Sequence, residues 1–118
     1  MQAIEKAKKI VKCLDDKKGR RITLLEVGEL TSISDYFVIA SGGSATQVKA
    51  MADEVTDKMA EAGLTPVHIE GYHVASWILL DYGDVVVHIF LEETREFYDI
   101  ERLWIDAKQI SLDFLEEA

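Results

Sequence analysis

The chain has 118 residues, 48% of them hydrophobic, so it can bury one core without a metal or a disulfide, and we expect a single domain over residues 1–118. Acidic residues outnumber basic ones by 22 to 13. The net charge of −9 disfavours binding to nucleic-acid phosphates and favours a basic partner; an acidic surface that only maintains solubility is the alternative.

The first elements are a helix and a strand. Apolar residues at helical spacing predict a helix over residues 3–17, which Gly19 closes. A strand over residues 22–27 follows, and then a loop over residues 28–34.

The next strand and helix are the clearest in the chain. The nearly continuous apolar run 36–41 predicts a strand buried on both faces, which is therefore central in its sheet. Ser44 and Gln47 form a capping box that opens a second helix, and Gly63 ends it. Its predicted buried stripe is Val48, Met51, Ala52, Val55, Met59 and Ala62.

A short strand over residues 65–70, with Val67 and Ile69 directed inward, precedes a hairpin. After Leu91 the helical spacing returns, and the predicted apolar positions of this last helix are Phe97, Ile100, Leu103 and Trp104. Residues 109–118 have a weak pattern, which we interpret as an amphipathic tail. This order predicts an α/β protein of the α+β type, with a mixed five-stranded sheet and helices packed on it.

The hairpin covers residues 75–90. Two β-rich apolar runs flank Tyr82 and Gly83, which predicts a type I′ turn with glycine at its second central position. With Asp81 opposite Asp84, the predicted pairs are Leu80 with Val85, Leu79 with Val86, Ile78 with Val87, and Trp77 with His88. One face is wholly apolar and must be core; it carries Ile78, Leu80, Val85, Val87 and Ile89.

The opposite face of the hairpin is mixed. It carries Trp77, Leu79, Val86 and Phe90 together with Asp81, Asp84 and His88. Such a face implies either a second covering layer or a docking surface, and both interpretations stay open. The two carboxylates that flank the turn repel each other unless a cation, a backbone donor or a partner meets them.

The glycine-rich sequence before the second helix is one pattern that could indicate chemistry. Gly42, Gly43 and Ser44 stand where a helix dipole could bind phosphate, but no P-loop lysine follows. A nucleotidyltransferase would need paired carboxylates on the next strand, which offers only His68 and Glu70. We interpret the glycine-rich opening as helix capping.

Other candidate ligands and nucleophiles lack the spacing that their chemistry needs. The three histidines, His68, His73 and His88, have no metal-site spacing and are interpreted as structural or surface residues. Packing or exposure explains Cys13 better than catalysis does. We therefore expect no enzyme activity, no cofactor and no metal.

The cysteine content and the length of the apolar runs predict the cellular compartment. Cys13 is the one cysteine, so no intramolecular disulfide can form, which fits a reducing compartment. No apolar run reaches the ~18 residues of a membrane-spanning helix, and residues 1–9 contain no apolar core of a signal peptide. We expect a soluble, cytoplasmic protein that binds no membrane.

Aromatic residues interleaved with charges are more suggestive of a protein-binding surface. They gather in the second half of the chain and are Tyr72, Trp77, Tyr82, Phe97, Tyr98 and Trp104. For Phe97 and Trp104, core packing is the favoured interpretation.

Several long motifs in order resemble the ribosomal silencing factor family, known as RsfS or Iojap. They are Asp35-Tyr36-Phe37-Val38-Ile39-Ala40-Ser41-Gly42, Gln47-Val48, Glu70-Gly71, Trp77-Ile78-Leu79-Leu80-Asp81-Tyr82-Gly83-Asp84, Val87-His88-Ile89-Phe90, Arg95, Phe97-Tyr98, Glu101 and Leu103-Trp104. The resemblance covers residues 3–108. Gly43 departs from it, since the family more often has asparagine there.

The resemblance implies a translation regulator that binds large-subunit ribosomal protein fourteen at the intersubunit face and hinders joining of the small subunit. It also implies a nucleotidyltransferase-like fold without the catalytic carboxylates, and a homodimer. A nucleotide-binding protein and a dimeric scaffold are the alternatives.

For this partner we expect contacts from the outward residues of the hairpin. Trp77 and Leu79 would be apolar anchors, Tyr82 would offer its ring and hydroxyl, and Asp81 and Asp84 would meet lysine or arginine. The second-rank candidates are Glu70, His73 and Tyr98.

Overall fold

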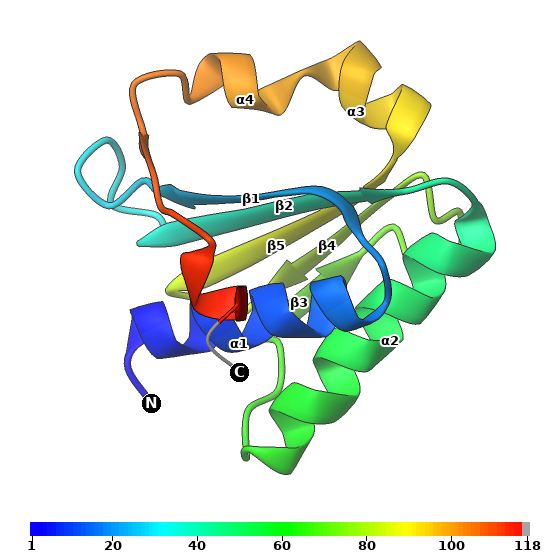
Figure 1. The fold of residues 1–118 in the computed structure, drawn as a ribbon, viewed down its shortest axis with the longest axis horizontal. Helices are drawn as coiled ribbons and strands as arrows, with labels where there is room; N and C mark the ends of the chain where they lie inside the picture. The colour runs from blue at the N-terminus through cyan, green and yellow to red at the C-terminus, as the bar shows by residue number, and fades with distance from the viewer. Residues whose placement is uncertain (117–118) are drawn as a thin grey trace.

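Within residues 1–116, which the computed structural model describes, a six-stranded mixed sheet forms the middle layer (Figure 1). Its strands run in the order β3-β4-β5-β2-β1-β6. Their bounds are β1 Arg20–Glu26, β2 Tyr36–Gly42, β3 His68–Glu70, β4 Trp77–Asp81, β5 Val85–Leu91 and β6 Lys108–Gln109. β2 and β5 pair in parallel and the other neighbours antiparallel. The α+β architecture and the central place of β2 are confirmed.

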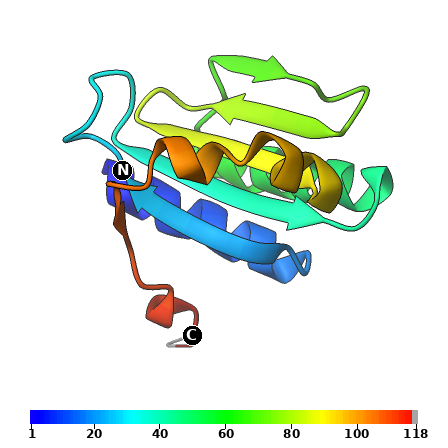
Figure 2. The same ribbon diagram turned by 90° about the horizontal axis from the view of Figure 1, so that it is seen from above.

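Helices lie on both faces of the sheet. α1 (Ala3–Asp16) and α2 (Ala45–Glu61) pack on one face, and α3 (Glu92–Tyr98) and α4 (Ile100–Leu103) lie across the other. Seen from above in Figure 2, α3 and α4 cross over β2 and β5, whereas β3 and β4 extend beyond them. One edge of that face therefore has no helix on it. Within residues 1–116, no helix is long and apolar enough to cross a membrane.

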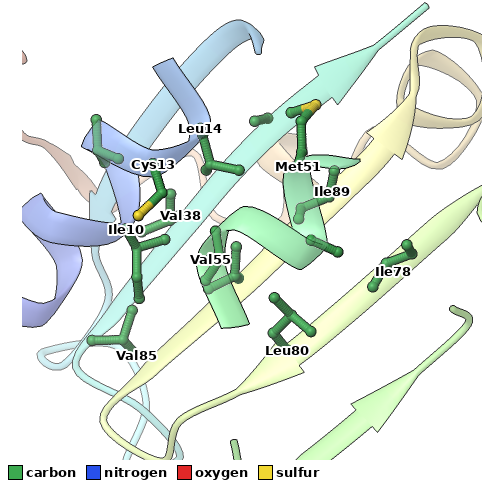
Figure 3. Packing of buried hydrophobic residues seen from close by; sticks show 14 of the residues in the cluster. Ile10, Cys13, Leu14, Val38, Met51, Val55, Ile78, Leu80, Val85 and Ile89 are labelled. Atoms are coloured by element: carbon green, nitrogen blue, oxygen red, sulfur yellow. The ribbon is translucent and has the colours of Figure 1, made fainter. Parts of the chain in front are cut away.

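The larger core fills the space between the sheet and α1 with α2 (Figure 3). The hairpin residues predicted as core all lie in it and are at most 1% exposed: Ile78, Leu80, Val85, Val87 and Ile89. They face the buried stripes of the two helices, which include Ile10 and Val55. Alternate residues of the strands thus pack against the apolar side of each helix in one core.

The start of α2 is a helix cap, as the sequence predicts. The Ser44 hydroxyl accepts a hydrogen bond from the backbone N–H of Gln47 at 3.1 Å, and the Gln47 side chain accepts one from the Gly43 N–H at 2.8 Å. Its amide nitrogen also donates to the carbonyls of Lys17 and Lys18. Gln47 therefore joins the end of α1 to the start of α2, and capping accounts for the glycine-rich sequence.

The hairpin pairs two residues away from its predicted register. Trp77 lies opposite Phe90 and Leu79 opposite His88, and the Tyr82 N–H donates to the Val85 carbonyl. The turn residues are therefore Gly83 and Asp84, with Gly83 at φ +86° in the first central position, as in a type II′ turn. The predicted type I′ register is wrong. A slip of two leaves every strand residue on its predicted face, because side chains alternate.

β3 is shorter than predicted, and the two apolar residues predicted to be inward are exposed. Val67 is 76% exposed and Ile69 is 46% exposed. Ile69 does lie toward α2, but a groove of about 340 Å³ separates them, lined on the helix side by Ala52 and Thr56. β3 is one of the two edge strands, and α2 does not reach over it.

The segment after β5 forms two short helices, broken at Asp99, whose φ is 44°. The expected buried pattern is half right. Ile100 is buried and Trp104 half-buried, whereas Phe97 and Leu103 are 80% and 79% exposed. The inward position of α3 is occupied by Arg95 instead.

The predicted tail over residues 109–118 begins within the sixth strand, and its last two residues, 117–118, lie outside the described part of the chain. Lys108 and Gln109 pair with β1, and the chain then crosses to α1, where the 3₁₀ helix Asp113–Glu116 lies (Figure 1). Partly buried apolar residues of this segment pack on the larger core: Ile110, Leu112, Phe114 and Leu115. The five-strand prediction missed β6 because it is two residues long and exposed.

Candidate docking surface

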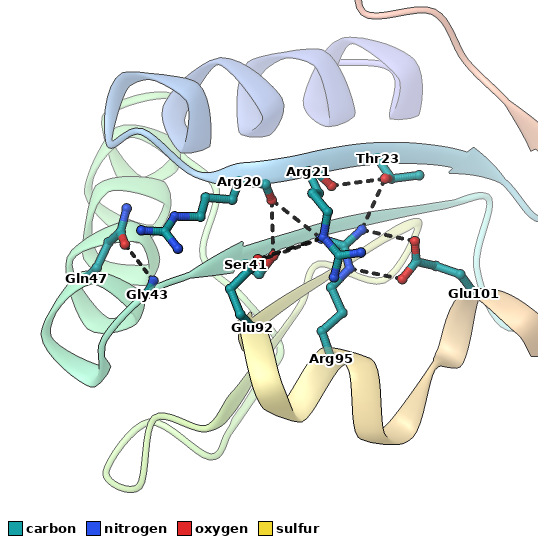
Figure 4. A network of polar contacts seen from close by, with 9 residues as sticks. All are labelled: Arg20, Arg21, Thr23, Ser41, Gly43, Gln47, Glu92, Arg95 and Glu101. Atoms are coloured by element: carbon teal, nitrogen blue, oxygen red, sulfur yellow. Dashed lines mark hydrogen bonds and ion pairs between the residues drawn. The ribbon is translucent and has the colours of Figure 1, made fainter.

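A buried arginine fixes α3 and α4 on the sheet (Figure 4). Arg95 is 2% exposed, and its guanidinium pairs with the Glu101 carboxylate of α4. It also donates to the Ser41 hydroxyl of β2 at 3.1 Å and to the Thr23 hydroxyl of β1 at 3.2 Å. The Ser41 hydroxyl in turn donates to Glu92. One side chain thus connects both helices to two strands.

Arg95 was not predicted to have this role. In the sequence it is one of several charges in an amphipathic segment, so nothing marks it as buried. The hydrogen bonds from Arg95 lower the pKa of the Glu101 carboxyl below its usual value, which keeps the pair ionised.

The mixed face of the hairpin is covered over part of its width. Phe37, Val86 and Phe90 form a second core beneath Ile100 and Trp104, and the rings of Phe37 and Trp104 meet edge-on at 5.0 Å. On β4 this cover ends, and Trp77 and Leu79 are half-buried. Both interpretations of the face therefore hold in part: a covering layer over the centre and an open edge at β4.

At this open edge aromatic rings form a continuous row. The ring of Trp77 lies 4.8 Å from Phe90 beneath it and 5.1 Å from Tyr98 of α3. Tyr98 packs edge-on against Phe97 at 5.1 Å. Tyr98 is 53% exposed and Phe97 80%. We call the surface made by Trp77, Leu79, Phe97 and Tyr98 the aromatic face.

A groove of about 360 Å³ adjoins the aromatic face. Its lining residues are Trp77 and Leu79 of β4 with Glu70 and Gly71 at the end of β3. The Glu70 carboxylate is exposed and lies 2.9 Å from Nε2 of His68 on the same strand. An acidic group therefore stands beside an apolar, partly exposed surface.

Two predicted contact residues lie elsewhere. Tyr82 is 7% exposed in the larger core, where burial raises the pKa of its hydroxyl to about 12. Asp84 forms an ion pair of 3.0 Å with Lys6 of α1. The shifted turn is the reason: Tyr82 continues the inward alternation of Ile78 and Leu80, so its ring is not offered to a partner.

The other candidates divide between the surface and local structure. The Asp81 carboxylate is half-buried and accepts a hydrogen bond from the Gly83 N–H at 2.7 Å. Each of the two carboxylates near the turn therefore has a partner that offsets their repulsion: a backbone donor for Asp81 and the Lys6 ammonium for Asp84. His73 is exposed and packs edge-on against Tyr72, whose hydroxyl donates to Asp53 of α2. Of the predicted set, the structure brings Glu70, Trp77, Leu79 and Tyr98 together.

The side chains considered for catalysis are placed unfavourably for it. Cys13 is buried, and burial raises the pKa of its thiol to about 11, so a thiolate is not available near neutral pH. In the part of the chain that the structure describes, no three histidine, cysteine, aspartate or glutamate side chains gather as a metal site.

An exposed aromatic row at the edge of a sheet is typical of a module that binds another macromolecule. The chain belongs to the ribosomal silencing factor family, because the family model described as "Ribosomal silencing factor during starvation" matches residues 1–118. It is 42% identical over 100 residues to the ribosomal silencing factor RsfS of Bacillus subtilis, covering 85% of each chain.

Two further relatives extend this comparison. The crystal structure of a Chromobacterium violaceum protein, 41% identical, superimposes with a TM-score of 0.87 over 94% of this chain and 92% of that one. The mouse protein called "Mitochondrial assembly of ribosomal large subunit protein 1" is 36% identical over an alignment of 98 residues, and the match covers 80% of this chain and 43% of the mouse protein.

Proposed function

We propose that this protein docks on the large ribosomal subunit through large-subunit ribosomal protein fourteen at the intersubunit face, and so hinders joining of the small subunit in the cytoplasm. The observation that carries the proposal is the aromatic face, which presents Trp77, Leu79, Phe97 and Tyr98 beside the acidic Glu70. The family membership supports the ribosome as the target, and the name of the mouse relative supports the large subunit.

The chemistry of the face suits a basic ribosomal protein. The chain carries a net charge of −9, which steers a basic partner toward it and repels free nucleic-acid phosphates. Partly exposed aromatic side chains supply most of the binding free energy of such interfaces, while charges at the rim act on the association rate. Steric hindrance needs binding alone, without any reaction.

The nucleotide-binding alternative finds less support in the geometry. The strand after α2 carries His68 and Glu70, which contact each other, and the N-terminal cap of α2 is formed by Ser44 and Gln47. A metal-dependent transfer of a nucleotide would need two carboxylates beside that cap.

The test is sedimentation through sucrose at low and physiological salt, with purified large and small subunits. We expect the protein to migrate with free large subunits and to reduce the yield of assembled ribosomes when it is added first. A pull-down with isolated ribosomal protein fourteen identifies the contact. The absence of any association at low salt would overturn the proposal and leave the dimeric scaffold.

The site is tested with Tyr98→Ala and Trp77→Ala. Tyr98 is half exposed, so we expect weaker binding with little change in stability. Trp77 packs on Phe90, so its truncation also lowers stability, and the affinity has to be measured on the folded fraction. A truncation of either side chain that leaves affinity unchanged would place the contact elsewhere.

A further inference from the structure

His88 is a buried polar residue in an apolar surrounding. It lies at the middle of β5, opposite Leu79, and is 6% exposed. Its ring lies 5.0 Å from Phe37 of β2 and 6.3 Å from Phe90, the next residue on the same face of β5. Its neighbours on that face of β5, Val86 and Phe90, are apolar, and an apolar side chain at position 88 would continue their pattern.

The side-chain hydrogen bond of His88 is made with Trp77, a residue of the aromatic face. Nδ1 of His88 accepts a hydrogen bond from the indole Nε1–H of Trp77 at 3.2 Å. Among the described residues, Nδ1 of His88 is the one acceptor for the indole N–H of Trp77. Accepting through Nδ1 requires the neutral imidazole with its proton on Nε2. Burial favours this form, since it lowers the pKa of His88 to about 4.

Keeping this imidazole has a cost in stability. Nε2 is buried, and its N–H has no hydrogen-bond partner among the described residues, so the hydrogen bond that it makes to water in the unfolded chain is not replaced. A leucine here would avoid that cost and still pack against Phe37 and Phe90. The Trp77 bond is what the histidine adds.

We propose that His88 is the positioning residue of the aromatic face: by accepting the indole N–H of Trp77, it holds the ring in the orientation in which it binds the partner. The role rests on the proposed function, because it assumes that Trp77 contacts the ribosomal partner. Ring contacts with Phe90 and Tyr98 are not directional, whereas one hydrogen bond at Nε1 selects one orientation of the indole. Preorganisation lowers the entropy lost on binding.

Two substitutions separate this role from packing. In His88→Asn, the side-chain oxygen can take the place of Nδ1 and accept the indole proton, while His88→Leu has no acceptor but is the better buried strand residue. We expect the leucine variant to be at least as stable as the asparagine variant. We expect its affinity for purified large subunits to fall about tenfold, while the asparagine variant stays within about threefold of wild type.

A spectroscopic measurement reports the bond without any partner. The chain has two tryptophans, so the indole N–H resonance of Trp104 serves as the internal reference for that of Trp77. In His88→Leu we expect the Trp77 resonance to shift and its proton to exchange faster with water, with the Trp104 resonance little changed. His88→Asn restores slow exchange.

A third variant changes the donor of the same hydrogen bond, and it keeps the inference testable if a histidine variant fails to fold. Trp77→Phe keeps a ring and removes the donor. We expect it to lose affinity to a similar extent as His88→Leu, and the double variant to lose little more than either alone.

Separate outcomes overturn the inference and the proposed function. If Trp77→Ala abolishes binding while His88→Leu binds as wild type, or if affinity follows the melting temperature across the variants, His88 acts in packing alone. If Trp77→Ala itself binds large subunits as wild type does, the aromatic face is not the contact, and the positioning role falls with it.

Discussion

Arg95 on α3 and Glu101 on α4 form a two-pronged ion pair, in which Nε and Nη2 each lie 3.0 Å from a different carboxylate oxygen. The pair spans the break at Asp99 and joins the two short helices, which lie above β2 and β5. The position of Tyr98, at the end of α3, depends on it. The aromatic face is therefore supported from beneath by a charged cluster.

Removing one member of this pair is expected to be worse than removing both. Glu101→Leu leaves the guanidinium of Arg95 buried without its carboxylate, and we expect the free energy of unfolding to fall by about 3 kcal/mol. The double variant Arg95→Met with Glu101→Leu should recover part of that loss, because two apolar side chains need no charge partner. Urea denaturation measures both.

The matched control is the exposed ion pair between Lys12 and Asp16 on α1, at 2.8 Å. We expect Lys12→Met to leave the urea midpoint nearly unchanged, since exposed pairs contribute little. A double variant at 95 and 101 that is no more stable than Glu101→Leu would show that the network stabilises more than its own charges.

The pH dependence of stability provides a second prediction. The pKa of His88 is lowered from 6.5 to about 4 by burial, so between these values the unfolded chain binds a proton that the folded chain does not. The free energy of unfolding therefore falls as pH is lowered from about 6.5 to about 4. Above this window His88 is neutral in both states, and the full stability is present. Denaturant titrations between pH 7 and pH 4.5 measure the slope.

His88→Leu is the control for that slope, because it lacks the titrating group and keeps every carboxylate. We expect its stability to depend less steeply on pH between about 6.5 and 4.5. Parallel curves for the two proteins would mean that His88 is protonated as readily in the folded chain as in the unfolded one.

Exposed apolar residues allow a test of the surface without a change in the core. Phe97 and Ile33 are each 80% exposed, the first on the aromatic face and the second in the loop between β1 and β2. We expect both Phe97→Ala and Ile33→Ala to keep the melting temperature of the wild type. Phe97→Ala alone should weaken binding to large subunits, by about tenfold. Equal affinities would exclude α3 from the contact.

Charge substitutions separate the rim of the face from the scaffold. Glu70 is exposed beside the groove, so Glu70→Gln should slow association with large subunits, and this effect should fade as salt is raised. Asp84 pairs with Lys6 of α1, so Asp84→Asn should lower stability by about 1 kcal/mol and leave affinity intact. Stopped-flow association at two salt concentrations distinguishes them, and the reverse assignment would return Asp84 to the docking surface.

The elements that the sequence predicted well are those where local pattern and burial agree. The apolar run of β2 and the alternation of the hairpin each follow from one repeat that the core enforces, so Ile78 and Val87 lie where expected. The register of the hairpin was not predictable in the same way. A turn at Tyr82 and Gly83 and a turn at Gly83 and Asp84 both give glycine a position with positive φ, and tertiary contacts decide between them.

The arrangement of residues on the candidate docking surface was predictable in part, for a related reason. Trp77 and Leu79 follow from alternation alone. Whether their face is covered depends on where α3 and α4 lie, and this depends on Arg95, whose burial no local pattern reveals. Phe97 was assigned to the core because an aromatic residue at helical spacing usually packs inward, and the left-handed Asp99 breaks that spacing.

The crossing of the C-terminal segment from β6 to α1 bears on how the protein is made. The ammonium group of Lys8 on the first helix lies 5.3 Å from the ring centre of Phe114, so residues from opposite ends of the described chain meet. During synthesis, the β1 edge stays unpaired until residue 109 has left the exit tunnel, and this side of α1 stays uncovered until residue 114 has left it. Contacts this distant in sequence form late, because a long loop has to close first. A chain stalled before that point would expose the β1 edge to other nascent chains.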